Sequence, residues 1–145
     1  MFSDNRTELR QQFFDAWQKQ ENNEILSPLE ATICQVIAEH PEYHFIFNHI
    51  DRYLDQDYLP ELGETNPFLH LSMHLGIREQ VATNRPKGIR QIHQSLQAKL
   101  NSELEAEHLM MDALAETLWQ AQRDNKAPDE NLYLKRLKKL LKQYK

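Results

Sequence analysis

Two histidines that lie four residues apart, His70 and His74, are the side chains that this sequence places best for chemistry. The stretch 66–80 around them predicts a helix, because Asn66 is a good N-cap and Pro67 suits the first helical position. The spacing puts both imidazoles on one face of that helix. The helix is apolar nearly all round over its first three turns, which is typical of a helix buried inside a bundle. Two buried imidazoles need hydrogen-bond partners or a metal ion.

Histidines elsewhere in the chain can complete a metal site around this pair. Helix bundles bind metal ions through inward side chains of facing helices. His108 falls on the expected inward face of a second long helix, and His44 can reach inward from a third segment. Three or four nitrogen and oxygen ligands suit zinc, iron, nickel or manganese. The sequence therefore predicts a metal site whose ligands are His70, His74, His108 and His44.

Other interpretations of the same polar residues stay open. The histidines can be structural, bonding to buried backbone groups or carboxylates and pinning helices together. The Glu105-x-x-His108 spacing occurs in di-iron bundles, but the sequence has it once and Glu105 is also a capping residue. Arg78, one turn beyond His74, is expected to form a structural ion pair with an acidic residue. The motifs of serine hydrolases, phosphate-binding loops and zincins are absent, so no reaction is predicted.

Composition and capping patterns predict an all-α fold. Only 3 of the 145 residues are glycine, which leaves little material for hairpin turns. Ser27 with Glu30 has the pattern of a capping box, and so has Ser102 with Glu105. We expect a single domain over residues 1–145, a bundle of about six helices with the helix of residues 66–80 buried at its centre.

Two finer expectations concern individual segments. Residues 42–54 are expected to form one short helical segment. The long helix that begins after Ser102 is expected to bury one face, and its residues are Leu104, His108, Met111, Ala115 and Leu118.

The last helix differs in charge from the rest of the chain. Residues 128–145 carry six basic and two acidic side chains, whereas residues 1–127 carry 11 basic and 20 acidic ones. We expect this basic C-terminal helix to pack its leucines on the bundle and to expose its lysines. Nucleic-acid binding through those lysines is an alternative function that no recognised sequence motif supports.

A third alternative is a non-catalytic module that binds a protein partner or a second copy of the chain. Large apolar side chains that can serve such contacts, or pack in the core, are Trp17, Tyr43, Phe45, Phe47, Met110, Met111 and Trp119. No apolar run approaches the ~20 residues that a membrane span needs. The first residues lack the layout of a signal peptide, so a cytoplasmic protein is expected, with its single cysteine, Cys34, as a small core residue.

Several motifs, in a fixed order along the chain, are similar to those of a known family. They are His40-Pro41-Glu42-Tyr43-His44, Asn66-Pro67-Phe68-Leu69-His70, His74 with Ile77-Arg78-Glu79-Gln80, Arg85-Pro86 with Gly88-Ile89, and Glu107-His108 with Met110-Met111. The sequence resembles a bacterial family named for a domain of unknown function, number eighteen forty-one. The resemblance covers almost the whole chain and implies a small bacterial protein without an assigned activity.

Overall fold

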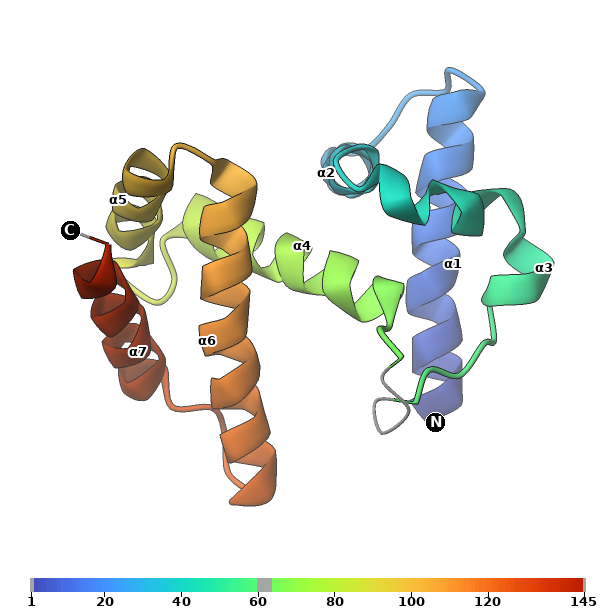
Figure 1. The fold of residues 1–145 in the computed structure, drawn as a ribbon. Helices are drawn as coiled ribbons and strands as arrows, with labels where there is room; N and C mark the ends of the chain where they lie inside the picture. Colours follow the sequence, from blue (N-terminus) through green and yellow to red (C-terminus); the bar gives the residue numbers. More distant parts are fainter. Residues whose placement is uncertain (1, 60–63, 145) are drawn as a thin grey trace. The chain divides into compact units, whose positions relative to one another are not determined.

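The computed structural model describes residues 2–59 and 64–144, with side chains from residue 6 onward. These residues form seven α-helices and one 3-10 helix, and they include no strand (Figure 1). The predicted all-α class is confirmed, but about six helices was too low a number. The contacts divide the chain into two compact units, Met1–Leu75 and Gly76–Lys145.

One of the additional helices arises in the segment 42–54, which was expected to be one helix. The 3-10 helix η1 (Pro41–Asn48) and the short helix α3 (Ile50–Tyr53) occupy it, and His49 between them leaves the helical region with φ −139° and ψ 62°. In a 3-10 helix, residues three apart lie on the same side. His44 and Phe47 have that spacing, and both rings contact Trp17, at 5.2 and 6.2 Å between centroids.

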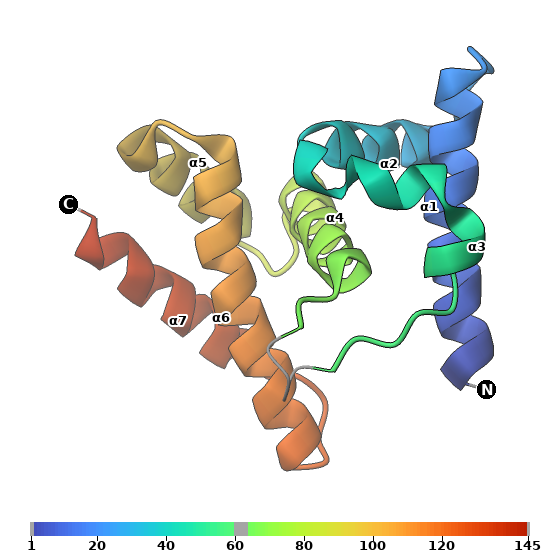
Figure 2. The ribbon, with the colours of Figure 1, turned by 45° about the vertical axis from the view of Figure 1, so that its right-hand side comes forward.

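The N-terminal unit is built on an aromatic and aliphatic core. It contains α1 (Phe2–Glu21), α2 (Pro28–Ala38), η1, α3 and the residues of α4 (Pro67–Thr83) up to Leu75. In two views, α2 runs across α1 rather than along it (Figures 1 and 2). The ring of Phe68 at the start of α4 packs between Phe13 and Phe14 of α1, with centroids 6.3 and 5.9 Å away. Cys34 is buried in this core, as expected, and its thiol donates to the carbonyl of Ala16.

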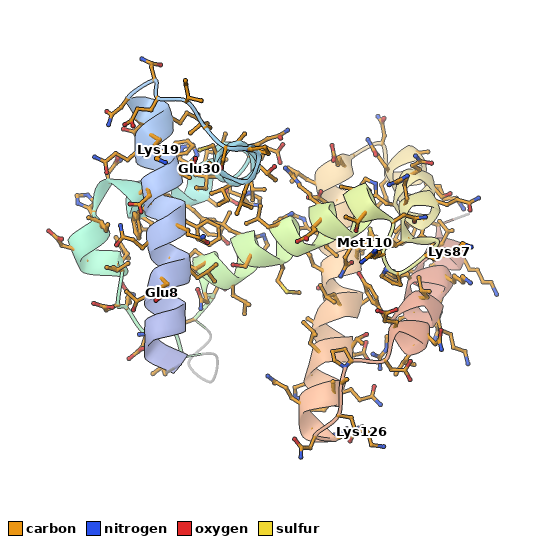
Figure 3. All side chains as sticks on the ribbon, turned by 180° about the vertical axis from the view of Figure 1, so that it is seen from behind. Glu8, Lys19, Glu30, Lys87, Met110 and Lys126 are labelled. Atoms are coloured by element: carbon orange, nitrogen blue, oxygen red, sulfur yellow. The ribbon has the colours of Figure 1, made fainter. Side chains whose placement is uncertain are left out.

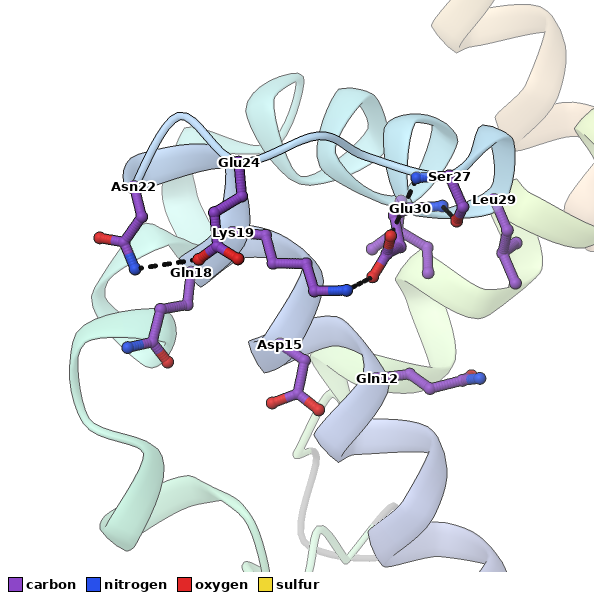
Figure 4. Close-up of a pocket in the computed structure, with 10 residues that line it drawn as sticks. Gln12, Asp15, Gln18, Lys19, Asn22, Glu24, Ser27, Leu29 and Glu30 are labelled. Atoms are coloured by element: carbon purple, nitrogen blue, oxygen red, sulfur yellow. Dashed lines mark hydrogen bonds and ion pairs between the residues drawn. The ribbon is translucent and has the colours of Figure 1, made fainter.

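The capping box predicted at the start of α2 is present. The Ser27 hydroxyl accepts from the Glu30 backbone N–H at 3.1 Å, and the Glu30 carboxylate accepts from the Ser27 N–H at 2.9 Å (Figure 4). The other oxygen of Glu30 accepts from Lys19 of α1 at 2.7 Å. One acidic side chain therefore caps α2 and ties it to α1, which fixes where α2 begins.

The C-terminal unit contains the rest of α4 together with α5 (Ile89–Leu100), α6 (Glu103–Arg123) and α7 (Glu130–Gln143). Helix α6 packs against both α5 and α7, and α5 also packs against α7. The turn between α4 and α5 requires a glycine, because Gly88 has φ 102°. The amide oxygen of Asn84 accepts from the backbone N–H groups of Gly88 and Arg90, which starts α5 without a conventional cap.

The face of α6 that was expected to be buried is correct only in part, because Met111 of the expected set is buried and other members are not. The buried side chains are Ala106, Glu107, Met110, Met111, Ala113 and Thr117, and Met110 is labelled in Figure 3. Of the expected set, Ala115 is exposed and Leu118 is 39% exposed. The reason is that the buried face includes a charged residue, Glu107, whose ionic partner lies on another helix, so a purely apolar pattern selected a neighbouring face.

Helix α7 buries Tyr133 and Leu137 and exposes Lys135, Lys138, Lys139 and Lys142. Arg136 points the other way, and its guanidinium donates to the Thr117 hydroxyl of α6 at 2.9 Å. The basic helix is therefore bound to α6 by an arginine while its lysines face solvent. Among the described residues, no helix is long and apolar enough to cross a membrane.

Candidate metal centre

Helix α4 presents His70 and His74 on one face of the N-terminal unit. The helix begins as predicted: the Asn66 amide oxygen accepts from the backbone N–H groups of Phe68 and Leu69 at 3.0 and 3.2 Å. Pro67 is its first residue, where a missing N–H costs nothing. His74 is fully buried and His70 half-buried. Their rings lie 4.9 Å apart between centroids, as expected for an i, i+4 pair.

The end of α2 supplies a third histidine, His40. Pro41 ends that helix, because a proline ring restricts the residue before it and lacks an N–H. His40 is accordingly non-helical, with φ −125° and ψ 66°, and its side chain is buried. Its Nδ1 lies 2.7 Å from the carbonyl oxygen of Val36. A carbonyl only accepts, so Nδ1 carries the proton and, in the neutral ring, Nε2 is unprotonated.

The three Nε2 atoms converge, with that of His74 in the middle. Nε2 of His74 lies 3.1 Å from Nε2 of His40 and 3.2 Å from Nε2 of His70. One ligand nitrogen from each ring lies within 4.8 Å of both others. Three imidazole nitrogens at these separations can share a proton or bind one metal ion.

Tyr43 of η1 forms an aromatic wall beside this cluster. Its ring stacks on His40 with centroids 5.8 Å apart and an interplanar angle of 4°, and it meets the edge of His70 at 5.9 Å. The stacked ring restricts His40 to one orientation. The rings that carry the nitrogens are therefore held by packing as well as by hydrogen bonds.

The structure places the other two predicted ligands as follows. His44 lies on η1, where its Nε2 donates to the carbonyl of Ile37 at 2.8 Å and its ring packs on Trp17. The histidine that lies beside His70 and His74 in the N-terminal unit is His40 and not His44. His108 lies on α6 in the C-terminal unit, with its Nδ1 3.6 Å from a carboxylate oxygen of Glu105.

The position of His40 beside His74 was not predicted, because the sequence shows no regular spacing between it and the pair on α4. It stands 34 residues before His74, at the end of another helix. The sequence did contain one indication that His40 has a fixed position. It stands directly before Pro41, where a helix must end, and it belongs to one of the motifs that resemble the family. A histidine fixed at a helix end is a candidate ligand even without a periodic partner.

The ion pair expected for Arg78 is present in the C-terminal unit. Its Nε donates to Oε2 of Glu107 at 2.9 Å and its terminal nitrogen donates to Oε1 at 3.2 Å. This bidentate arrangement matches the fork of the guanidinium to both carboxylate oxygens. Glu107 is 1% exposed, so the pair compensates a charge that is buried.

A hollow of about 510 Å³ lies between α1 and the start of α2, but its chemistry differs from that of the histidine cluster (Figure 4). Its polar side chains contact one another, as in the Lys19–Glu30 pair and the hydrogen bond from the Asn22 amide to Glu24 at 3.5 Å. The direct hydrogen bond to Lys19 holds the pKa of the Glu30 carboxyl below its usual range. These contacts join the two helices, and neither of the two groups of possible metal ligands found among the described residues lies in this hollow.

The fold and the cluster define an all-helical protein with converging histidines in its N-terminal unit. The chain belongs to the family described as "Domain of unknown function (DUF1841)", which matches residues 5–139. No curated protein and no solved structure matches the chain. The resemblance found in the sequence motifs is thereby confirmed, and it covers both compact units.

Proposed function

We propose that the protein binds one transition-metal ion through Nε2 of His40, His70 and His74. The observation that carries the proposal is the central position of the His74 nitrogen, which is in close contact with both other nitrogens. Two nitrogens on a tetrahedral zinc ion, with bonds of about 2.0–2.1 Å, are about 3.3 Å apart. The separations of 3.1 and 3.2 Å are close to that value, so an ion fits with small movements of the rings.

Counting protons favours a metal ion over a purely structural cluster. An N–H···N hydrogen bond needs one proton between its two nitrogens. Neutral His40 has its proton on Nδ1, so its Nε2 only accepts. If Nε2 of His74 carries a proton and donates it to His40, this nitrogen has no lone pair to accept from His70. If instead it accepts from His70, it has no proton to donate to His40. Three neutral rings satisfy one of the two contacts, whereas a metal ion accepts a lone pair from each.

The surroundings of His40 are those of a metal ligand. Ligating histidines usually donate their second ring nitrogen to a carbonyl or carboxylate, which fixes the tautomer and the orientation of the ring. The bond from His40 Nδ1 to Val36 does this. Three imidazole nitrogens suit zinc first, and also nickel, iron or manganese. His108 remains a ligand predicted from the sequence, and its test is the metal content of His108→Ala.

The test is elemental analysis of untagged protein purified without chelators, before and after reconstitution with each of the four metals. We expect the metal content to fall by about one ion per chain in His40→Ala and in His74→Ala. His49→Ala is the matched control, because His49 is exposed at the junction of η1 and α3. Circular dichroism of each variant confirms that its helices persist.

Absence of metal from the purified and the reconstituted protein would overturn the proposal. The three histidines would then be structural, and the search for function would move to partners of a non-catalytic interaction module. Equal metal content in the wild type and in both buried-histidine variants would also overturn it, because the ion would then lie elsewhere.

A further inference from the structure

A second group of metal-binding side chains lies wholly within the C-terminal unit. His93 comes from α5, and Glu103 and Glu107 come from the first turns of α6, which packs against α5. The two carboxylates are four residues apart and so share one face of α6. One ligand atom of each of the three side chains lies within 4.8 Å of both others.

His93 contributes a ring nitrogen to this group. It is 7% exposed, and no described residue forms a hydrogen bond or ion pair with it. A polar group that is buried to this degree ordinarily has a partner. Its ring nitrogen is too far from the carboxylates for a direct hydrogen bond, yet within 4.8 Å of them. An ion bound between the ring nitrogen and the carboxylate oxygens would fit a separation of this size.

Arg78 holds the Glu107 carboxylate in place. Its guanidinium donates to both oxygens of that carboxylate, at 2.9 and 3.2 Å. The guanidinium fixes the orientation of the carboxylate and offsets its charge. The second carboxylate, Glu103, is exposed and brings a further negative charge, together with access from solvent.

We infer that His93, Glu103 and Glu107 form a second site, which binds a divalent cation. Two ligand atoms on opposite sides of an octahedral ion are separated by twice the bond length, which is about 4.0–4.2 Å for bonds of about 2.0–2.1 Å. The spacing of the group therefore accepts one ion between the three side chains. One imidazole and two carboxylates favour manganese, iron(II) or zinc over calcium. Arg78 is a positioning residue, because it acts on the ion through Glu107.

The test uses Mn²⁺ and the full chain. The fraction of free Mn²⁺, measured by electron paramagnetic resonance during titration, gives the number of bound ions and their affinity. Glu103→Gln keeps the size of an exposed side chain, so the fold is retained while one anionic ligand is lost. His93→Gln removes the imidazole, and Asp112→Asn is the control because it changes another exposed acid of α6.

We expect Mn²⁺ affinity at one site to fall about tenfold or more in Glu103→Gln and in His93→Gln, and to stay unchanged in Asp112→Asn. No Mn²⁺ binding up to millimolar concentration, or binding that both variants leave unchanged, would overturn the inference. The result is separable from the proposal for His40, His70 and His74, because the variants of each site leave the ligands of the other intact.

Discussion

Nε2 of His40 lies 3.1 Å from Nε2 of His74, although the two residues stand 34 positions apart in the chain. Each of them has an independent reason for its place. Pro41 ends α2 directly after His40, and α4 is fixed by its Asn66 cap four residues before His70. Two helix ends therefore determine a contact between imidazoles in a buried part of the N-terminal unit.

His44→Ala is predicted to keep the metal ion and to lose stability. The substitution removes the hydrogen bond from Nε2 to the Ile37 carbonyl and the packing on Trp17. We expect a loss of about 1 kcal/mol in the free energy of unfolding. Urea unfolding followed by circular dichroism measures the loss, and elemental analysis measures the metal. Loss of the ion in this variant would show that His44 is a ligand, as the sequence alone predicted.

Arg78→Met is predicted to be strongly destabilising, because it leaves the buried Glu107 carboxylate without its guanidinium. Breaking a buried ion pair at one partner costs about 3–5 kcal/mol. Adding Glu107→Gln to this variant removes the uncompensated charge and should restore a large part of the loss. The four chains of this double-mutant cycle are compared by urea unfolding. Additive effects of the two substitutions would contradict a direct interaction between the side chains.

Arg10→Met is predicted to destabilise the N-terminal unit. The buried guanidinium donates to the carbonyls of Leu54 and Gln56 at 3.1 and 2.8 Å, just beyond α3, and lies 4.7 Å from the ring centre of Phe68. Removing it leaves these carbonyls without their donor, at a cost of about 2–4 kcal/mol.

A fluorescence measurement localises this effect. The protein has two tryptophans, so Trp119→Phe leaves Trp17 of the N-terminal unit as the reporter. In that background, urea unfolding of Arg10→Met should have its midpoint at a clearly lower concentration. Arg6→Met is the control, because its ion pair with Asp57 is exposed and of small worth. Equal midpoints for the two variants would refute the assigned role of Arg10.

Tyr133 is predicted to make stability fall at high pH. Burial raises the pKa of its phenol well above the usual value, and its hydroxyl donates to the Gln80 amide oxygen at 2.7 Å. A pKa that is raised in the folded state gives stability that is complete below the unfolded value of about 10 and is lost as pH rises above it.

The measurement is the free energy of unfolding between neutral pH and the alkaline range for the wild type and Tyr133→Phe. The variant should lose about 1 kcal/mol near neutrality and show a weaker decline above pH 10. Tyr144→Phe, which changes a tyrosine of the exposed C-cap of α7, should follow the wild-type curve. Parallel curves for Tyr133→Phe and the wild type would contradict the assignment.

The parts of this structure that depend on local sequence were predictable. Asn66 and Pro67 start α4, Ser27 and Glu30 start α2, and in each case the side chain meets a backbone group within three residues. The His70–His74 pair follows from the helical repeat alone. Such features need no knowledge of the fold.

The parts that depend on contacts distant in sequence were not predictable. His40 meets His74 across 34 positions, and Glu107 is buried because Arg78, 29 positions earlier, compensates its charge. An apolar repeat cannot identify a buried acid, so the buried face of α6 was assigned correctly only in part. The contacts of His44 and Phe47 of η1 with Trp17 of α1 are likewise distant in sequence.

The most direct test of the central claim is X-ray absorption at the zinc edge. The sample is the Glu103→Gln chain loaded with one equivalent of Zn²⁺, so that the second proposed site does not contribute. Ligation by His40, His70 and His74 predicts a first shell with about three nitrogens near 2.0 Å and the outer-shell scattering of imidazole rings. A shell of oxygens without imidazole scattering, or a chain that retains no zinc, would contradict it.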